Sequence, residues 1–138
     1  MSGWKGGWYV VPYHVMFRDV DAFGHVNNAV YFSYFEHART LLWLGLTGGA
    51  GPLDINFIVA RAECDFHQQV GMEPIEICVR IGEMRTTSIE FLSEIRKVEG
   101  GEVAATGRVV VVLFDWEKQS KVPIGDDLRR RATGLQEV

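Results

Sequence analysis

A single helix that is apolar around most of its circumference sets the strongest constraint on how this chain can fold. Between residues 29 and 44, apolar side chains recur at spacings of three and four, which is the repeat of an α-helix. The main stripe consists of Val30, Tyr34, Phe35, Ala38, Leu41 and Leu42, and it is widened by Tyr31, Phe32, Trp43 and Leu44. A helix of this kind is usually wrapped by other structure and does not lie on a surface. Gly45 is predicted to end it.

The segments around this helix have the sequence pattern of β-strands. Within residues 74–83, positions 75, 77, 79 and 81 are isoleucine or valine and alternate with Glu76, Cys78 and Arg80, which is typical of a strand with one buried face. Strands are also expected at residues 8–17, 55–67, 87–98 and 102–116, and a short terminal helix at residues 126–133. The pair Gly100-Gly101 favours a tight hairpin turn between the last two strands. Pro12 fits the first strand only at an edge or a bulge.

A curved antiparallel sheet wrapped around the apolar helix would bury the apolar face of both elements. The predicted order is one strand, the long helix and then four consecutive strands. We therefore expect an α+β fold with a sheet of about five strands. A chain of 138 residues suits one domain, so residues 1–138 are predicted to form a single domain.

Composition argues against several classes of partner. The net charge is −4, and no cluster of lysine and arginine is large enough to follow a nucleic-acid backbone. The longest apolar run, residues 109–114, is far shorter than the ~20 residues that span a bilayer. The first residues lack the apolar stretch of a signal peptide. Cys64 and Cys78 are compatible with a disulfide, but free thiols in a reducing compartment are favoured. We expect a cytoplasmic protein without nucleic-acid or membrane partners.

An acidic, turn-forming segment leads directly into the helix. Residues 18–28 contain Asp19 and Asp21, then a glycine and a pair of asparagines. The first amides of a helix have no partner within the helix, and the helix dipole gives this end a partial positive charge. Asp21 precedes Asn28 by seven residues, which is enough for the chain to turn and bring carboxylate and amides to one pocket. The dipole would favour an ionised Asp21, as a base or nucleophile requires.

The same segment carries a family resemblance. The signature of the hotdog-fold thioesterases is similar to the run Asp19–Asn28, followed here by Tyr31, Phe35, Glu36 and Arg39. The similarity is to the branch that includes the 4-hydroxybenzoyl-CoA thioesterases. It implies the hotdog fold and hydrolysis of an acyl-CoA thioester to a free carboxylic acid and coenzyme A. It also implies a homodimer or homotetramer with the active site at the subunit boundary. No metal or other cofactor is implied, because coenzyme A arrives as part of the substrate.

The resemblance assigns the catalytic roles to three residues. Asp21 is implied as the general base or nucleophile, and a backbone amide at or near Asn28 as the group that polarises the acyl carbonyl. His25 is a candidate acid or base, or a group that orients the carboxylate, with a purely structural role in the loop as the alternative. Asp19 is expected to support the loop by hydrogen bonding.

Four further residues are candidates for substrate binding: Gly24, Asn27, Glu36 and Ser88. Each also has a structural alternative. Gly24 would permit a crowded backbone or a close approach of substrate. Asn27 would cap the helix, and so would Asn28. Glu36 would form an ion pair with Arg39, three residues further along the helix. Ser88 opens a central strand, where relatives often place a hydroxyl near the substrate.

Two other functions are compatible with the same fold. A non-catalytic acyl-CoA-binding regulatory domain is the first alternative, and a hotdog hydratase or dehydratase is the second. Asp21 argues against the first, and the start of the helix against the second. The sequence contains neither a His-Glu-x-x-His metal motif nor the Gly-x-Ser-x-Gly elbow of serine hydrolases. Residues 66–73 lack the proline and aspartate that many relatives carry there, which puts a nucleotide contact at this turn in doubt.

Overall fold

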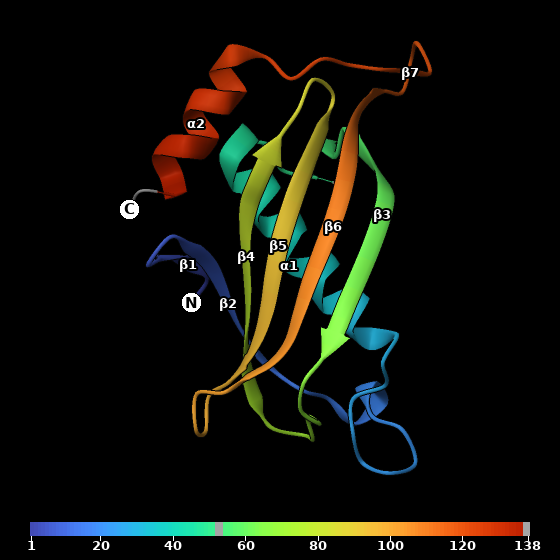
Figure 1. Cartoon of the computed structure of the whole chain (residues 1–138), viewed down its shortest axis with the longest axis vertical. Coiled ribbons are helices and arrows are strands. Elements are labelled where there is room, and N and C mark those ends of the chain that lie inside the picture. Colours follow the sequence, from blue (N-terminus) through green and yellow to red (C-terminus); the bar gives the residue numbers. More distant parts are fainter. Residues whose placement is uncertain (52–53, 137–138) are drawn as a thin grey trace.

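The computed structural model describes residues 1–51 and 54–136 and shows one long helix lying across a curved antiparallel sheet (Figure 1). In chain order the elements are β1 (Gly3–Lys5), β2 (Trp8–His14), the 3-10 helix η1 (Phe17–Asp19), α1 (Val30–Thr47), β3 (Phe57–Phe66), β4 (Pro74–Met84), β5 (Ser88–Lys97), β6 (Val103–Asp115), β7 (Ser120–Lys121) and α2 (Asp126–Gln136). The sheet has the order β1-β2-β4-β5-β6-β3, and β7 pairs with the end of β6. Neighbouring strands are antiparallel throughout.

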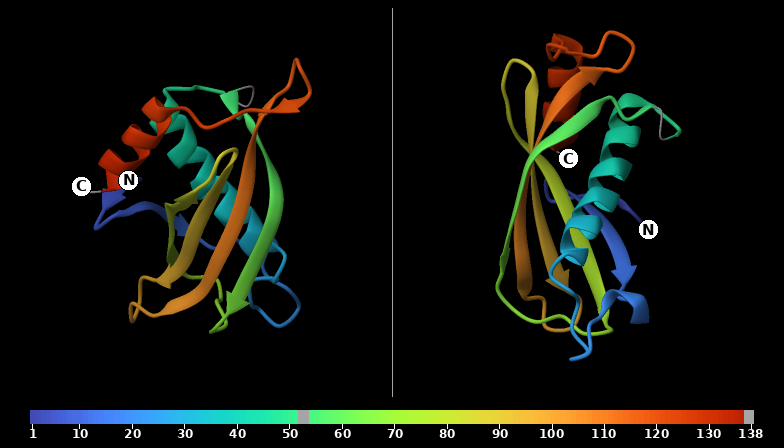
Figure 2. Two further views of the ribbon diagram at one scale, coloured as in Figure 1. Left: turned by 45° about the horizontal axis from the view of Figure 1, so that its top comes forward. Right: turned by 90° about the vertical axis from the view of Figure 1, so that its right-hand side faces the viewer.

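The predicted α+β class and the wrapped helix are confirmed. Figure 2 shows the sheet curving around α1, which lies on its concave side. The sheet has seven strands in the described part of the chain, compared with the five expected, because β1 and β7 are two short additions. The first strand ends at His14, since residues 17–19 turn into η1. The turn at Gly100-Gly101 is confirmed, with φ of 93° and 75°.

The prediction that Gly45 ends the helix was wrong. α1 continues to Thr47, and Gly48 caps it with φ of 74° while its N–H donates to the Leu44 carbonyl at 2.9 Å. The helix extends past Gly45 because Leu46 continues the apolar stripe and is only 2% exposed. Burying a leucine contributes roughly 1.5–3 kcal/mol, which outweighs the roughly 1 kcal/mol cost of one glycine inside a helix.

The core lies between α1 and the sheet. The helix packs against β2, β3 and β4, and the inward face of β4 is fully buried at Ile75, Ile77, Val79 and Ile81. Trp43 meets Phe57 and Phe91 with ring centroids 5.2 and 6.4 Å apart. Both cysteines are free, as favoured by the sequence, and burial raises the pKa of each thiol to about 11. In the described part of the chain, no helix is long and apolar enough to cross a membrane.

Two glycines on the helix–sheet contact should respond to alanine in opposite ways. A Cβ on Gly107 of β6 would overlap the Phe35 ring, so Gly107→Ala should lower the free energy of unfolding by about 1–3 kcal/mol. Gly45 has open space around it inside α1, so Gly45→Ala should raise that free energy by roughly 0.5–1 kcal/mol. Urea unfolding of both variants measures the difference. Equal effects of the two changes would mean that the close approach at Phe35 is not a constraint.

The two sides of the sheet end differently. On one side, β2 pairs with β4 only between Pro74 and Val79. Helix α2 lies beside the rest of β4. Gln136 accepts the N–H of Ile81, and Arg129 donates to the carbonyls of Met84, at 3.1 Å, and Arg85. On the other side β3 is the last strand of the sheet, and Ile58, Val59 and Phe66 on it are exposed. The sheet therefore has one long open edge at β3, and on the other side α2 covers the part of β4 that β2 leaves unpaired.

Candidate active site

The segment before α1 folds as a miniature hairpin. Val20 and Val26 form an isolated antiparallel bridge, and the Asp21 N–H donates to the His25 carbonyl at 2.8 Å. The Gly24 N–H donates to the Asp21 carbonyl at 3.0 Å, and Gly24 has φ of 79°. A three-residue loop that ends in a left-handed residue is a common hairpin connection, and glycine adopts that conformation without strain. The hairpin thus explains why glycine stands at position 24.

Replacing Gly24 tests this geometry. Gly24→Val should lower the free energy of unfolding by about 1–3 kcal/mol, because a branched side chain is strained at positive φ. No atom lies within 4 Å of a Cβ at this position, so the cost comes from the backbone alone. Activity should fall as well, since the loop carries Asp21 and His25. Thermal or urea unfolding combined with a turnover assay measures both effects. A variant as stable and as active as the wild type would contradict this interpretation.

Asp21 holds the hairpin with one carboxylate oxygen. Its Oδ1 accepts the N–H of Phe23 at 2.9 Å and that of His25 at 3.4 Å, and the residue is exposed. No donor from the described residues contacts Oδ2. The structural alternative of a turn-forming aspartate is therefore correct for one oxygen, and the second oxygen is left available to a ligand.

Asp19 is buried and structural, as the sequence predicted. Its Oδ2 accepts the Tyr34 hydroxyl at 2.9 Å, the Tyr13 hydroxyl at 3.3 Å and the Met16 N–H at 3.1 Å. These contacts connect β2, the turn before η1 and helix α1. Burial, followed by the hydrogen bond to Asp19, raises the pKa of Tyr34, so its hydroxyl remains a donor. Asp19 thus anchors the base of the loop that carries Asp21.

The turn before α1 leaves one backbone amide without a partner among the described residues. Asn27 uses its side-chain Oδ1 to accept the Ala29 N–H at 2.9 Å, and its carbonyl accepts the Val30 N–H at 2.9 Å. Ala29 occupies the N-cap position, so neither asparagine is the N-cap itself. Within the described residues, no acceptor contacts the Asn28 N–H. Asn27 therefore shapes the turn, and Asn28 presents an unpaired amide at the helix N-terminus.

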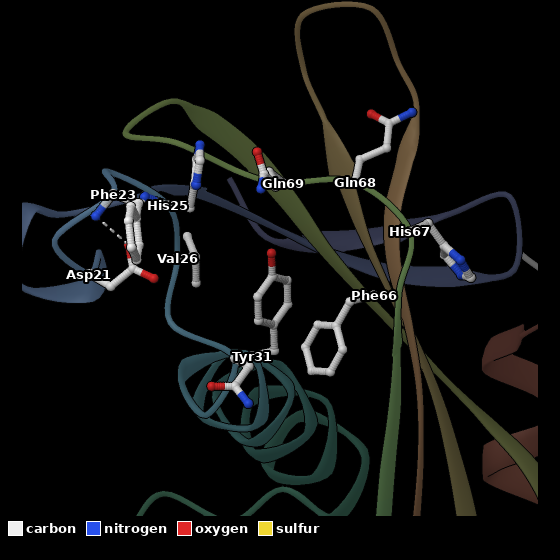
Figure 3. Close-up of a pocket in the computed structure, with 10 residues that line it drawn as sticks. Asp21, Phe23, His25, Val26, Tyr31, Phe66, His67, Gln68 and Gln69 are labelled. Atoms are coloured by element: carbon white, nitrogen blue, oxygen red, sulfur yellow. Dashed lines mark hydrogen bonds between the residues drawn. The ribbon is translucent and has the colours of Figure 1, made fainter.

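Asp21, His25 and Asn28 line one cavity of about 520 Å³ (Figure 3). Three parts of the chain form its wall, namely the hairpin, the first turn of α1, and the end of β3 with the connection to β4. The lining residues are Asp21, Phe23, His25, Val26, Asn28, Tyr31, Phe66, His67, Gln68 and Gln69. The Val26 N–H donates to the Val70 carbonyl at 2.7 Å, which fixes the hairpin to the connection.

One wall of this cavity is not predicted by the sequence. The segment from Phe66 onwards stands out in the sequence only because it lacks the turn pattern of relatives, and Tyr31 stands out only as part of the apolar stripe. Phe66 packs edge-on against Tyr31 with ring centroids 5.0 Å apart. Phe66 is 48% exposed although it is a large apolar side chain on a strand. This exposure marks it as a residue of the cavity, and it is visible only in the structure.

The remaining candidates lie elsewhere in the described structure. Gly24 and Asn27 shape the loop and do not line the cavity. Ser88 lines a smaller cavity of about 160 Å³ with Arg61 and Arg108. Glu36 lines a third cavity, of about 460 Å³, together with Arg39. Neither Glu36 nor Ser88 shares the cavity of Asp21 within one chain.

The alternative of an ion pair between Glu36 and Arg39 is wrong in the described structure. Arg39 is buried to 5% exposure, and its Nε has no hydrogen-bond partner among the described residues. Burial lowers the pKa of Arg39, and the charge of Glu36 acts in the opposite direction. The rest of this third cavity is mainly apolar, with Leu44, Ile55, Phe57 and Val59 in its wall. No group of three or more metal-ligating side chains is present in residues 1–51 and 54–136.

The comparisons with known proteins agree with this architecture. Residues 15–132 match the family described as the thioesterase-like superfamily. The protein YsmA of Bacillus subtilis (strain 168), which is uncharacterized, is 32% identical over 116 residues, covering 82% of this chain and 77% of YsmA. A thioesterase from Thermus thermophilus, whose crystal structure contains coenzyme A and Zn, is 29% identical with a TM-score of 0.81, and 94% of each chain is covered. A thioesterase-superfamily protein from Jannaschia sp. CCS1 is 25% identical with a TM-score of 0.84, covering 94% of this chain and 84% of the other.

These matches define the class of protein as a thioester hydrolase with the hotdog fold. The chain belongs to the thioesterase-like superfamily.

Proposed function

We propose that the protein hydrolyses acyl-CoA thioesters in the cavity of about 520 Å³ at the start of α1. The observation that carries the proposal is that Asp21, which has one carboxylate oxygen without a partner among the described residues, lines the same cavity as Asn28, whose N–H is also unpaired there. Hydrolysis of a thioester needs a base or nucleophile at the carbonyl carbon and a donor for the oxygen that becomes negative. The coenzyme A bound to the Thermus thermophilus thioesterase supports an acyl-CoA as the substrate.

The general-base route assigns each proton and electron pair. Asp21 removes a proton from water while the water oxygen bonds to the acyl carbon. The carbonyl π electrons move to oxygen, where the Asn28 N–H stabilises the negative charge. Collapse reforms the carbonyl, breaks the carbon–sulfur bond and releases the thiolate, which takes the proton from Asp21. The products are a carboxylic acid and the thiol of coenzyme A. His25 is on the same loop and lines the same cavity, and we propose that it orients Asp21 or assists this proton transfer.

Asp21 could instead attack the acyl carbon directly and form an anhydride, and isotope labelling separates the two routes. A single turnover in ¹⁸O-water places label only in the product acid if water attacks the thioester. An anhydride that is hydrolysed at its aspartyl carbonyl places the label in Asp21 itself. Mass spectrometry of the peptide that contains residue 21 reads the result.

Release of free thiol from a panel of acyl-CoAs tests the proposed function. The panel should contain short and long aliphatic acyl groups and aromatic acyl groups, with acyl carrier protein thioesters as a second series. Cleavage of at least one substrate with saturation kinetics supports the proposal. Tight binding of acyl-CoA without release of thiol would overturn it and indicate a binding domain.

We also propose that a second copy of the chain pairs with the open edge of β3. An exposed strand edge offers unpaired backbone groups, and homodimers commonly form around a two-fold axis. A two-fold axis makes the two β3 strands antiparallel, so the Phe66 end of one lies beside the Phe57 end of the other. Phe66 lines the cavity of Asp21, and Phe57 lines the cavity of Glu36 and Arg39. Pairing would join these two cavities across the boundary and give Glu36 a place in the partner's substrate site.

A further inference from the structure

Tyr31 carries a polar group in the wall of the Asp21 cavity that is rigidly held and has no role in the steps above. The residue is 3% exposed, yet within the described residues its hydroxyl makes no hydrogen bond. Tyr13 and Tyr34, its neighbours in the core, both donate to Asp19. The hydroxyl oxygen is not among the fully buried polar atoms that lack a partner in the described residues, so it opens onto the cavity and can donate to a ligand there.

The ring of Tyr31 is fixed in place. Phe66 packs edge-on against it at 5.0 Å between centroids, and Tyr34 contacts it from the other side at 6.3 Å. Figure 3 shows the hydroxyl directed into the space between the loop that carries His25 and the connection that carries Gln69. A donor held in this way needs no reorganisation when charge develops in front of it, which is the condition for electrostatic catalysis.

Tyr31 stands in the first turn of α1, at the end of the helix that borders the cavity. Asn28 precedes the N-cap residue Ala29 and lines the same cavity. Side chains on a helix lean towards its N-terminus, so the phenol extends towards the cavity that Asn28 also lines.

The geometry points to the Tyr31 hydroxyl as a second donor, beside the Asn28 N–H, to the oxygen of the substrate's acyl carbonyl. This inference rests on the proposed function and adds a catalytic residue to it. The carbonyl oxygen becomes negatively charged in the transition state, and two hydrogen-bond donors stabilise that charge more than a single amide does.

The phenol acts as a donor and not as a base. Burial, followed by the electrostatic influence of Cys64 and Glu73, raises the pKa of Tyr31 above its ordinary value of 10.0. The hydroxyl therefore keeps its proton at neutral pH.

Tyr31→Phe removes only the hydroxyl and is the first test. We expect kcat to fall about 10²-fold with KM unchanged, because the hydrogen bond strengthens only as the oxygen becomes negative. The free energy of unfolding should stay constant or rise slightly, since a hydroxyl without a protein partner is lost. Tyr34→Phe is the matched control, because it removes a hydroxyl bonded to Asp19 and should reduce stability more than turnover.

A 3,5-difluorotyrosine at position 31 is the second test, because it lowers the pKa of the phenol without removing it. The rate should then fall at alkaline pH as the phenol ionises, in a range where the wild type stays active. A role in packing alone would leave the pH profile unchanged. An active wild type whose Tyr31→Phe variant keeps the same kcat overturns the role of Tyr31 and leaves the proposed function intact. A wild type that cleaves no thioester overturns both.

Discussion

Asp21→Asn should lower kcat by about 10²–10⁴-fold while KM changes little. The amide keeps the size of the side chain and can still accept the N–H of Phe23, so the hairpin should hold. What disappears is the basicity and negative charge of the oxygen that has no partner among the described residues. Thiol release by the wild type and the variant, measured over a range of substrate concentrations, gives both constants. Hydrolysis of every acyl-CoA at the wild-type rate would mean that another group is the base.

Asp19→Asn is the matched control, two residues earlier on the same loop. Its carboxylate accepts three hydrogen bonds in the core, and bonds to a charged acceptor contribute roughly 1.5–3 kcal/mol each. The variant should therefore lose several kcal/mol of unfolding free energy, while the folded fraction keeps more activity than Asp21→Asn. A loss of turnover in a fully stable Asp19→Asn protein would reverse the roles of the two aspartates.

Val59→Asp should convert an assembled protein into monomers and abolish most of its activity. Val59 is 50% exposed on the open strand β3 and lines the cavity that contains Arg39. Burying an unpaired carboxylate at a boundary costs about 3 kcal/mol or more, which raises the dissociation constant at least about 10²-fold. Activity should fall with dissociation, because the proposed site takes Glu36 from the partner. Light scattering and thiol release on the same samples measure the two effects together.

Val98→Asp separates the effect of position from the effect of charge. Val98 has a similar exposure, 55%, but lies beyond the end of β5, away from the open edge. This variant should keep both assembly and turnover. A wild type that is monomeric and fully active, or a Val59→Asp protein that remains assembled, would contradict pairing through β3.

The elements that could be predicted are those whose own residues define a repeat. α1 and the four long strands contain enough apolar positions at spacings of three and four, or of two, for their type to be read directly. β1, with three residues, and β7, with two, contain no such repeat, since each exists only because a partner strand is adjacent. Gly45 resembles a helix end in the sequence. The sequence does not show that Leu46, one residue later, is buried in the core and extends the helix.

The same distinction applies to the candidate site, where some residues are positioned by local sequence and others by the tertiary structure. Asp21, His25 and Asn28 are close in the sequence, and local turn chemistry brings them to one cavity. The expectation for Ser88 came from analogy with relatives, but the register of β5 with β6 sets this residue in a different cavity. Tyr31 fits the core stripe because periodicity gives the face of a helix and says nothing of where the end of a long side chain arrives. The position of Phe66 depends on the order of strands in the sheet, which sequence spacing does not encode.

The unequal edges of the sheet limit how far it can grow. A second copy that pairs with β3 through a two-fold axis uses the same edge on both chains, so no long edge remains for a third. At the far side, Gln136 and Arg129 of α2 already occupy the backbone groups that would accept another strand beside β4. The outermost strand there, β1, has only three residues. With α2 in this position, the dimer proposed above would leave no long edge for a further strand, so fibril-like extension is not expected.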